Sequence, residues 1–352
     1  MFGTFLNSDV TILLKDISGL VDPLPASVRE PLIQSGVHYS EMLPVEYVPT
    51  SDYMDLFESA LHRYAPITAE AVVEVSRRIY TAKGSDVVLL SLARAGIPVG
   101  ILIKRCLRLM YDIEAPHYAL SIIRGKGIDE NALKHVLSLH EASAIQFVDG
   151  WTGKGAIQRE LSSALSGYPG IDDGLAVLSD PANVAGVCGT HEDFLIASSC
   201  LNSTVSGLLS RTFLRDDIIG PSDYHGAAFY AELADSDLTY KFIDRIEEEV
   251  RKVAATSRMG QEPAPSRSGM AEVLEIAERY GIRDINLVKP GIGEATRVLL
   301  RRVPWKVLVG SLDDELHLGH LYQLAREKNV NVEVYPLRNY KACGLIREMA
   351  DS

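Results

Sequence analysis

The sequence predicts an α/β protein in which a parallel sheet flanked by helices is followed by a small C-terminal α/β/α sandwich. Short apolar runs rich in β-branched residues alternate with segments of helical periodicity, as in a parallel sheet with crossover helices. The pattern is interrupted over residues 254–268, where Pro, Ser and Gly without apolar periodicity indicate a linker. We therefore divide the chain into residues 1–253, the linker and residues 269–352.

Length and composition agree with an intracellular two-domain enzyme. The 352 residues are 47% hydrophobic and 23% charged, which is enough to bury more than one core. The formal net charge of -12 argues against general nucleic-acid binding by the whole chain. The four cysteines show neither CxxC pairing nor metal-ligand spacing, and neither a signal peptide nor a long apolar span is found. We expect a reduced, cytoplasmic protein with no membrane partner.

The strand predicted at residues 144–148 ends in an acid and a glycine-rich turn. Asp149 is followed by Gly150-Trp151-Thr152-Gly153-Lys154-Gly155 and then by a helix-like segment from Ala156. This order places bare backbone amides and a helix N-terminus at one point, an arrangement that binds phosphate. An ordinary βα turn has the same pattern. The spacing fits neither the Walker A loop nor the dinucleotide-binding G-x-G-x-x-G pattern.

Two turns earlier in the chain also have residues suited to binding an anion. The apolar strand predicted at 86–91 leads into Ala93-Arg94-Ala95-Gly96-Ile97-Pro98 and a helix to about residue 110. Small residues permit close backbone approach, and proline suits the first turn of a helix. A strand at 119–123 is followed by Arg124-Gly125-Lys126-Gly127, which is either a mobile anion-binding hairpin or a solvated turn.

These three turns, in this order, resemble the pyrophosphate loop, the flexible lid and the ribose-5-phosphate loop of the type I phosphoribosyltransferases. Segments 2–14, 201–212 and 223–230 resemble more closely the orotate-phosphoribosyltransferase-like proteins encoded beside bacterial tellurite-resistance and stress-response genes. That family also bears the name StiP and has been described as a cysteine protease. The resemblance implies a type I phosphoribosyltransferase fold. It also implies a glycosyltransferase that uses phosphoribosyl pyrophosphate, or a related ribose phosphate, in nucleotide-like metabolism.

The resemblance assigns roles to individual residues. Asp149 would face the ribose hydroxyls and hold Mg²⁺ indirectly, while Arg124 and Lys126 would close the lid during loss of pyrophosphate from C1. The other ligand contacts fall to three sets of residues. The 5-phosphate would contact Thr152, Gly153, Lys154 and Gly155. The pyrophosphate would contact Ala93, Arg94, Ala95 and Gly96. The base or acceptor would contact Asn202, Ser203 and His225. The fold is compatible with a homodimer.

The C-terminal segment alternates strands and helices again. The predicted helices are 271–280, 294–302, 316–328 and 341–349. The predicted strands are 285–288, 306–309 and 332–335. Five cations and one acid lie between residues 289 and 306. Within this stretch the residues Gly291, Gly293, Glu294, Arg297 and Arg301 resemble the signature of the kink-turn-binding ribosomal-protein and Pelota family. The resemblance implies binding of structured RNA, and a solvated basic helix is the alternative.

Two further functions stay open. Cys188 or Cys200 can pair with His191 or His225 as the thiol and imidazole of a cysteine protease, although cysteine is more often a small buried hydrophobe. Residues 196–201, which include Cys200, are predicted to be the end of an apolar strand. Most type I phosphoribosyltransferases carry two adjacent acids where this chain has only Asp149. A catalytically inactive ribose-phosphate sensor coupled to RNA binding is therefore the other alternative.

Overall fold

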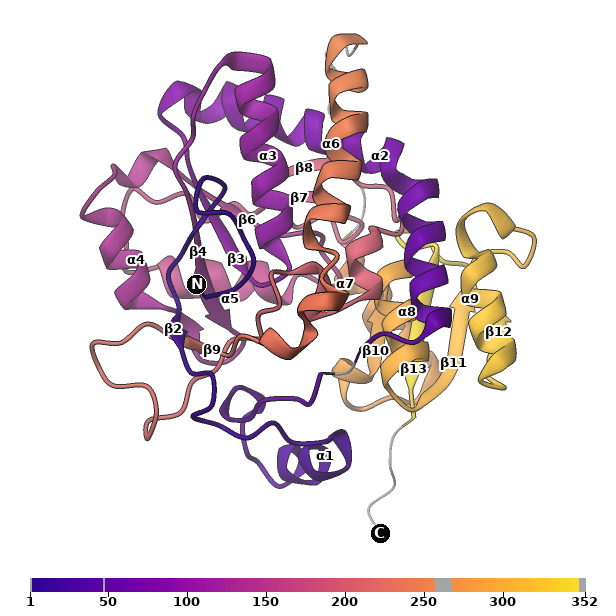
Figure 1. The fold of residues 1–352 in the computed structure, drawn as a ribbon. Coiled ribbons are helices and arrows are strands. Elements are labelled where there is room, and N and C mark those ends of the chain that lie inside the picture. The colour runs from indigo at the N-terminus through magenta and orange to yellow at the C-terminus, as the bar shows by residue number, and fades with distance from the viewer. Residues whose placement is uncertain (1, 47, 257–267, 348–352) are drawn as a thin grey trace.

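The computed structural model describes residues 2–46, 48–256 and 268–347, which form two α/β units (Figure 1). The first unit contains a seven-stranded sheet in the order β1-β4-β3-β6-β7-β8, with β5 paired to β4. All pairings are parallel except that of β5. The strands are β1 (Thr11–Ile12), β3 (Val88–Ala93), β4 (His117–Ile123), β5 (Gly127–Ile128), β6 (Ile145–Val148), β7 (Ala176–Ser179) and β8 (Val187–Thr190).

Helices cover both faces of this sheet (Figure 1). One face packs against α2 (Ser51–Lys83), α3 (Gly96–Tyr111) and α6 (Thr239–Thr256), and the other against α4 (Glu130–Leu137) and α5 (Ala156–Leu165). In β3, Leu89 joins the first core, whereas Val88 and Leu90 join the second. A strand buried on both faces has a continuous apolar sequence. The predicted strands at 86–91, 119–123 and 144–148 are therefore confirmed as β3, β4 and β6.

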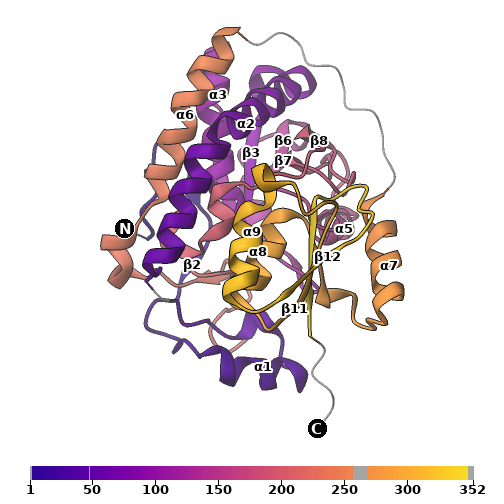
Figure 2. The same ribbon diagram turned by 90° about the vertical axis from the view of Figure 1, so that its right-hand side faces the viewer.

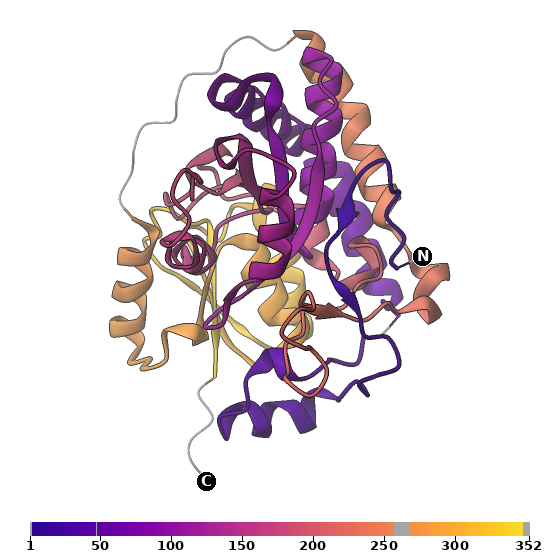
Figure 3. The same cartoon turned by 90° about the vertical axis from the view of Figure 1, so that its left-hand side faces the viewer.

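The N-terminal segment adds β1 to the edge of the main sheet and then lies beside residues 210–230 (Figure 3). Here β2 (Lys15–Asp16) pairs in parallel with β9 (Gly226–Ala227). The Lys15 ammonium donates to Asp223 Oδ2 at 2.6 Å and holds the loop before β9. The chain then runs through α1 (Ala26–Gln34) to the start of α2.

The second unit is the predicted α/β/α sandwich. Its sheet has the order β10-β13-β11-β12. Leu308 of β11 packs with α7 on one face, while Val307 and Val309 pack with α8 and α9 on the other (Figure 2). The elements are β10 (Val288–Pro290), β11 (Pro304–Val309), β12 (Asn331–Val334), β13 (Ala342–Ile346), α7 (Gly269–Tyr280), α8 (Ile292–Arg301) and α9 (Glu315–Glu327).

Two sequence predictions of local structure are wrong. The helix expected at 341–349 is the strand β13, which is buried throughout and lies between β10 and β11. Gly344 lets α8 approach this strand, because a Cβ there would lie 3.0 Å from Val298 Cγ2. The strand end expected at 196–201 is a 3₁₀ helix, Ala197–Cys200. Of the predicted linker, residues 254–256 belong to α6, Ser268 caps α7, and residues 257–267 lie outside the described residues.

The two units share a continuous core. The long helix α2 extends from the first sheet to the second unit, where Tyr53 Oη donates to Leu300 O at 2.9 Å and Tyr64 Oη to Leu316 O at 3.2 Å. Phe57 of α2 belongs to the same buried cluster as Leu299 of α8. The C-terminal unit is therefore docked on the first rather than tethered beside it. In the described part of the chain no helix combines the length and apolarity needed to cross a bilayer.

Substitution of Gly100 by alanine should destabilise the first unit. The new Cβ would lie 2.1 Å from Ser91 Oγ and 2.4 Å from His117 Nε2, two atoms that are hydrogen-bonded at 2.7 Å. Overpacking of this kind costs about 1–3 kcal/mol of the free energy of unfolding. Thermal denaturation followed by circular dichroism measures the effect. Gly167→Ala is the matched control, because a Cβ added at that position would meet nothing within 4 Å. Equal melting temperatures for the two variants would contradict this account of packing.

Candidate functional site

A cleft of about 270 Å³ opens in the first unit where β3 and β6 end, and Arg297 of the second unit also lines it. It gathers residues from several of the sequence predictions: Ala93, Arg94, Ala95, Asp149 and Asn202 all line it. The Arg94 guanidinium does not project freely into the cleft. It forms an ion pair with Glu46 at 3.0 Å and donates to Leu209 O at 2.5 Å. Gly96 lies at the start of α3, with its α-carbon packed on the backbone of β6.

Asp149 stands at the wall of this cleft, directly after β6. Its Oδ1 accepts a hydrogen bond from Gly150 N at 2.8 Å. Burial raises the pKa of this carboxyl to about 6, against the opposing effects of the Gly150 amide and the charge of Arg297. The acid is therefore positioned by the turn that follows it and faces a cation from the second unit.

The glycine-rich turn 152–155 is covered by the C-terminal unit. Tyr340 Oη donates to Gly153 O at 2.7 Å. The Lys154 ammonium donates to Ile285 O at 2.5 Å and to Val288 O at 3.2 Å. Burial, with the nearby charges of Lys289 and Arg124, lowers the pKa of Lys154 to about 8. Gly155 has φ +74° and begins α5, so the turn does need glycine at this point.

The predicted lid is an ordered turn between β4 and β5. The amides of Gly125 and Gly127 both donate to the Glu160 carboxylate, at 2.8 and 3.0 Å. Arg124 donates to Asn286 Oδ1 at 3.0 Å, and Lys126 lies 3.6 Å from Glu41. In this conformation the two cations are directed to partners in the second unit and the N-terminal segment.

The three residues predicted on the base side do not gather at one place. Asn202 lines the cleft, whereas Ser203 is buried. His225 bonds through Nδ1 to Ser121 Oγ at 2.9 Å, and its backbone amide donates to Asp129 Oδ2 at 2.5 Å. Burial lowers the pKa of His225, and both of these partners belong to the first unit.

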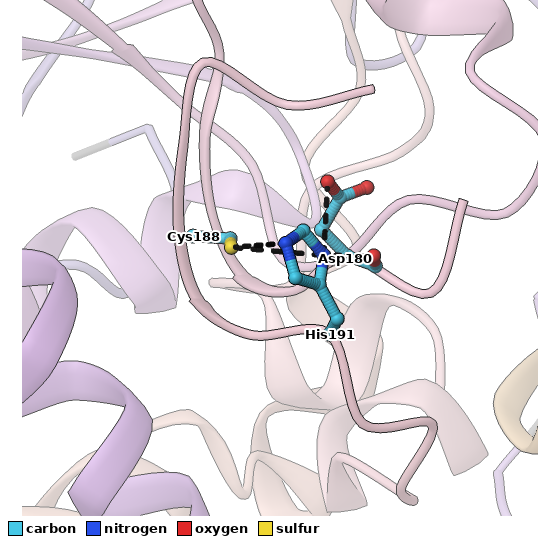
Figure 4. A group of neighbouring side chains, drawn as sticks. All are labelled: Asp180, Cys188 and His191. Carbon is cyan, nitrogen blue, oxygen red and sulfur yellow. Dashed lines mark hydrogen bonds and ion pairs between the residues drawn. The ribbon is translucent and has the colours of Figure 1, made fainter. Parts of the chain in front are cut away.

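A cysteine, a histidine and an aspartate meet at the ends of β7 and β8 (Figure 4). Cys188 Sγ lies 3.8 Å from His191 Nε2 and 3.9 Å from His191 Nδ1. His191 Nδ1 donates to the backbone carbonyl of Asp180 at 2.8 Å and lies 3.5 Å from its Oδ2. This is the order of a nucleophile, a base and an orienting acid. Of the predicted cysteine–histidine combinations, the structure brings together Cys188 and His191.

Asp180 directly follows β7 and is fully buried. Its carboxylate accepts from Val184 N at 2.9 Å, Ala185 N at 3.0 Å and Thr152 Oγ1 at 2.5 Å. These donors satisfy the buried charge and fix the turn that leads into β8. The Thr152 contact also links this cluster to the glycine-rich turn.

The same three side chains could hold a metal. Their ligand atoms lie within 4.8 Å of one another. Thiolate and imidazole donors are typical of zinc rather than of magnesium. The Mg²⁺ site expected near Asp149 stays a prediction.

The residues predicted to bind RNA lie at the boundary between the two units. Gly291, with φ +95°, precedes α8, and the amide of Ile292 donates to Asp193 of the first unit at 3.0 Å. A Cβ on Gly293 would lie 3.1 Å from Ser199 Oγ. Arg297 pairs with Glu294 at 3.1 Å and stacks on the Trp151 ring at 4.8 Å. Arg301 ends α8.

Two aspartates that the sequence interpretation did not single out hold this region together. Asp180 anchors the cysteine–histidine cluster, and Asp193 joins the two units. The sequence signal for Asp180 was its position two residues after the end of the apolar run 175–178. Nothing local distinguishes Asp193, because its partners, the amides of Ile292 and Lys341, are 99 and 148 residues away.

Comparisons with known proteins identify two family matches along the chain. Residues 3–247 match the family model described as "Tellurite-like stress resistance cysteine protease StiP", and residues 267–348 match the "PELOTA RNA binding domain". The "Cysteine protease StiP" of Acinetobacter baylyi is 35% identical over 367 residues, which cover 99% of this chain and 94% of the relative. No solved structure matches the chain.

These matches overturn the transferase prediction. The family and the relative are named as cysteine proteases, which are hydrolases, so the predictions of a phosphoribosyltransferase, of nucleotide metabolism and of phosphoribosyl pyrophosphate as a partner are wrong. The alternative of a ribose-phosphate sensor loses its support as well, because it assumed the same phosphoribosyltransferase resemblance. The mixed α/β architecture is confirmed, whereas the narrower phosphoribosyltransferase-type fold is not.

The other parts of the resemblance are confirmed. Both the stress-resistance family and the Pelota domain were expected from sequence motifs, and each is matched over nearly all of its predicted range. The chain belongs to the family of tellurite-like stress resistance cysteine proteases, StiP, and carries a Pelota RNA-binding domain in its C-terminal part.

Proposed function

We propose that this protein is a cysteine protease in which Cys188 is the nucleophile, His191 the general base and Asp180 the orienting acid. The observation that supports this assignment best is the approach of the His191 ring to Cys188 Sγ, which lies 3.8 Å from Nε2 and 3.9 Å from Nδ1. A cysteine nucleophile needs a neighbouring group that takes its proton, since the thiolate and not the thiol is reactive.

The tautomer of His191 follows from its hydrogen bond to the main chain. Nδ1 donates to Asp180 O at 2.8 Å, so Nδ1 carries the proton and Nε2 has the free lone pair. Nε2 therefore takes the thiol proton. The thiolate attacks a peptide carbonyl, the C–N bond breaks, and the protonated imidazole returns the proton to the leaving amine. Water then hydrolyses the acyl-enzyme and regenerates the thiol.

Asp180 supports the charged form of the imidazole. Its carboxylate lies 3.5 Å from His191 Nδ1 and keeps its place through hydrogen bonds from the Val184 and Ala185 amides. A carboxylate held in this way stabilises the imidazolium that forms during attack and fixes the ring orientation. Thr152 completes the support by donating to the same carboxylate.

Two of the other cysteines are poor nucleophiles for a physical reason. Burial raises the pKa of Cys106 to about 11, and burial also raises the pKa of Cys343. Such thiols stay protonated near neutral pH. Cys200 is fully buried at the end of a 3₁₀ helix. Cys188 is the cysteine whose sulfur faces a partly exposed imidazole, with 26% of the His191 side chain accessible.

We infer in addition that the C-terminal unit binds structured RNA. The match to the Pelota domain supports this function, as does the local excess of positive charge between residues 289 and 306. Binding that depends on Lys and Arg contacts to phosphate weakens as salt rises.

Cys188→Ala should reduce hydrolysis of an unfolded protein substrate by about a thousandfold or more, because loss of the nucleophile removes the acyl-enzyme route. The measurement is the release of fluorescent peptides from labelled casein by the full chain, with and without a structured RNA. Cys106→Ala, a matched buried cysteine, and Cys200→Ala should retain activity. Full activity in Cys188→Ala would refute the assignment, and loss confined to Cys200→Ala would move it to that residue.

His191→Ala should shift the reactivity of Cys188 to higher pH. An imidazolium beside a thiol favours the thiolate, so removal of the ring removes that stabilisation of the charged form. The rate of Cys188 alkylation by iodoacetamide, followed by peptide mass spectrometry across the neutral and alkaline range, measures the shift. His225→Ala is the control, because that ring bonds to Ser121. Identical profiles for His191→Ala and the unmodified chain would show that the imidazole does not activate this thiol.

A further inference from the structure

The C-terminal unit forms hydrogen bonds and an ion pair with the segment that carries the proposed catalytic residues. Gly269 N donates to Ala182 O at 2.9 Å, and Asn339 Nδ2 donates to Pro181 O at 3.1 Å. Both acceptors lie in the turn that begins at Asp180. On the other side of the cluster, Lys341 forms an ion pair with Glu192 at 3.1 Å. The flanks of Asp180 and His191 are therefore both fixed from outside the first unit.

Asp193 makes the most direct connection. Two residues beyond His191, its carboxylate accepts from Ile292 N at 3.0 and 3.1 Å and from Lys341 N at 2.9 Å. Ile292 is the first residue of α8, so the carboxylate sits on the positive end of that helix. A helix N-terminus with exposed amides is also where a phosphate binds. Asp193 thus occupies an anion position that belongs to the C-terminal unit.

The neighbouring contacts cover the rest of the predicted RNA surface. Arg297 donates to Ser199 O at 3.1 Å and stacks on Trp151, and Gly291 packs against Asp193. Ser199 Oγ, within the described residues, is buried beside Gly293 without a hydrogen-bond partner. The docked state therefore leaves this one buried hydroxyl at the boundary without a protein partner. Gly291, Ile292 and Gly293 are buried, so RNA reaches the N-terminus of α8 only when the units separate, whereas 28% of the Arg297 side chain is exposed in the docked state.

The proposed nucleophile is closed off in the docked state. Cys188 is only 4% exposed. Attack requires a peptide carbonyl at about 3–3.5 Å from the sulfur. Cys188 packs in a core of the first unit with Leu161 and Val177, so a peptide reaches that distance only when the segment 180–193 moves. The C-terminal unit holds this segment at residues 181–182 and 192–193.

We propose that the Pelota domain is a latch on the protease site and that structured RNA opens it, by competing with Asp193 for the N-terminus of α8. An RNA phosphate replaces the carboxylate, Arg297 leaves Trp151 for the RNA, and the segment 180–193 is released so that Cys188 becomes accessible. The effect on peptide hydrolysis rests on the proposed function. The competition between RNA and Asp193, and the exposure of Cys188, do not depend on it.

The first test measures RNA affinity. Fluorescence polarisation with a kinked RNA duplex that carries unpaired bases should show binding about tenfold tighter to Asp193→Ala than to the unmodified full chain, because the internal competitor is gone. Asp217→Ala removes the same charge from a carboxylate that pairs with Arg215, and it should leave the affinity unchanged. Asp193→Asn should give an intermediate value and replaces the alanine variant if that variant does not fold. Equal affinities for all the chains would overturn the competition.

The second test measures access to the thiol in the unmodified chain. Saturating kinked RNA should raise the rate of Cys188 alkylation by iodoacetamide about tenfold, while Cys106 alkylation stays constant. The fully paired duplex serves as the comparison RNA. An alkylation rate that RNA does not change would overturn the latch. If alkylation rises but casein is not hydrolysed, the latch stands and the protease assignment falls.

Discussion

The carboxylate of Asp193 is buried where the two units meet, and the arrangement of the site depends on it. A buried charge is stable only when it is hydrogen-bonded, and the partners it finds are backbone amides at Ile292 and Lys341 of the C-terminal unit. Burial raises the pKa of this carboxyl to about 6 in spite of those bonds. The loop after β8 can therefore keep its present path only while the C-terminal unit is docked. The position of His191, two residues earlier, is tied to the same condition.

The sequence allowed the first sheet to be predicted because its strands are apolar runs followed by glycine turns. In β3 and β6 this pattern has one structural solution, a buried parallel strand. It failed for β13, where Ala342-Cys343-Gly344-Leu345-Ile346 is too short for periodicity to separate a strand from a helix. The decisive fact for that segment, its place between two other strands, is a tertiary property.

The candidate site was less predictable, for a different reason. The turn 152–155 has the residues of a phosphate loop, but here they make internal contacts: Thr152 with Asp180, Gly153 with Tyr340, and Lys154 with the carbonyls of residues 285 and 288. A glycine turn offers the same amides and the same close approach to a ligand or to another domain. Composition alone could not distinguish the two uses. Cys188 and His191 are only three residues apart, yet no local sequence marks the pair, and Asp180 completes it from another strand.

A cysteine protease that shares its compartment with its own potential substrates needs a means of withholding its nucleophile. In this chain the proposed nucleophile is covered by the core of the first unit, and the C-terminal domain holds both ends of the segment that carries it. Such an arrangement separates two requirements. Reactivity depends on short contacts within the first unit, between Cys188, His191 and Asp180, whereas access depends on contacts between units, through Asp193 and Arg297. Because these two sets share no side chain, a ligand of the C-terminal unit can alter access without altering the chemistry of the thiol and its base.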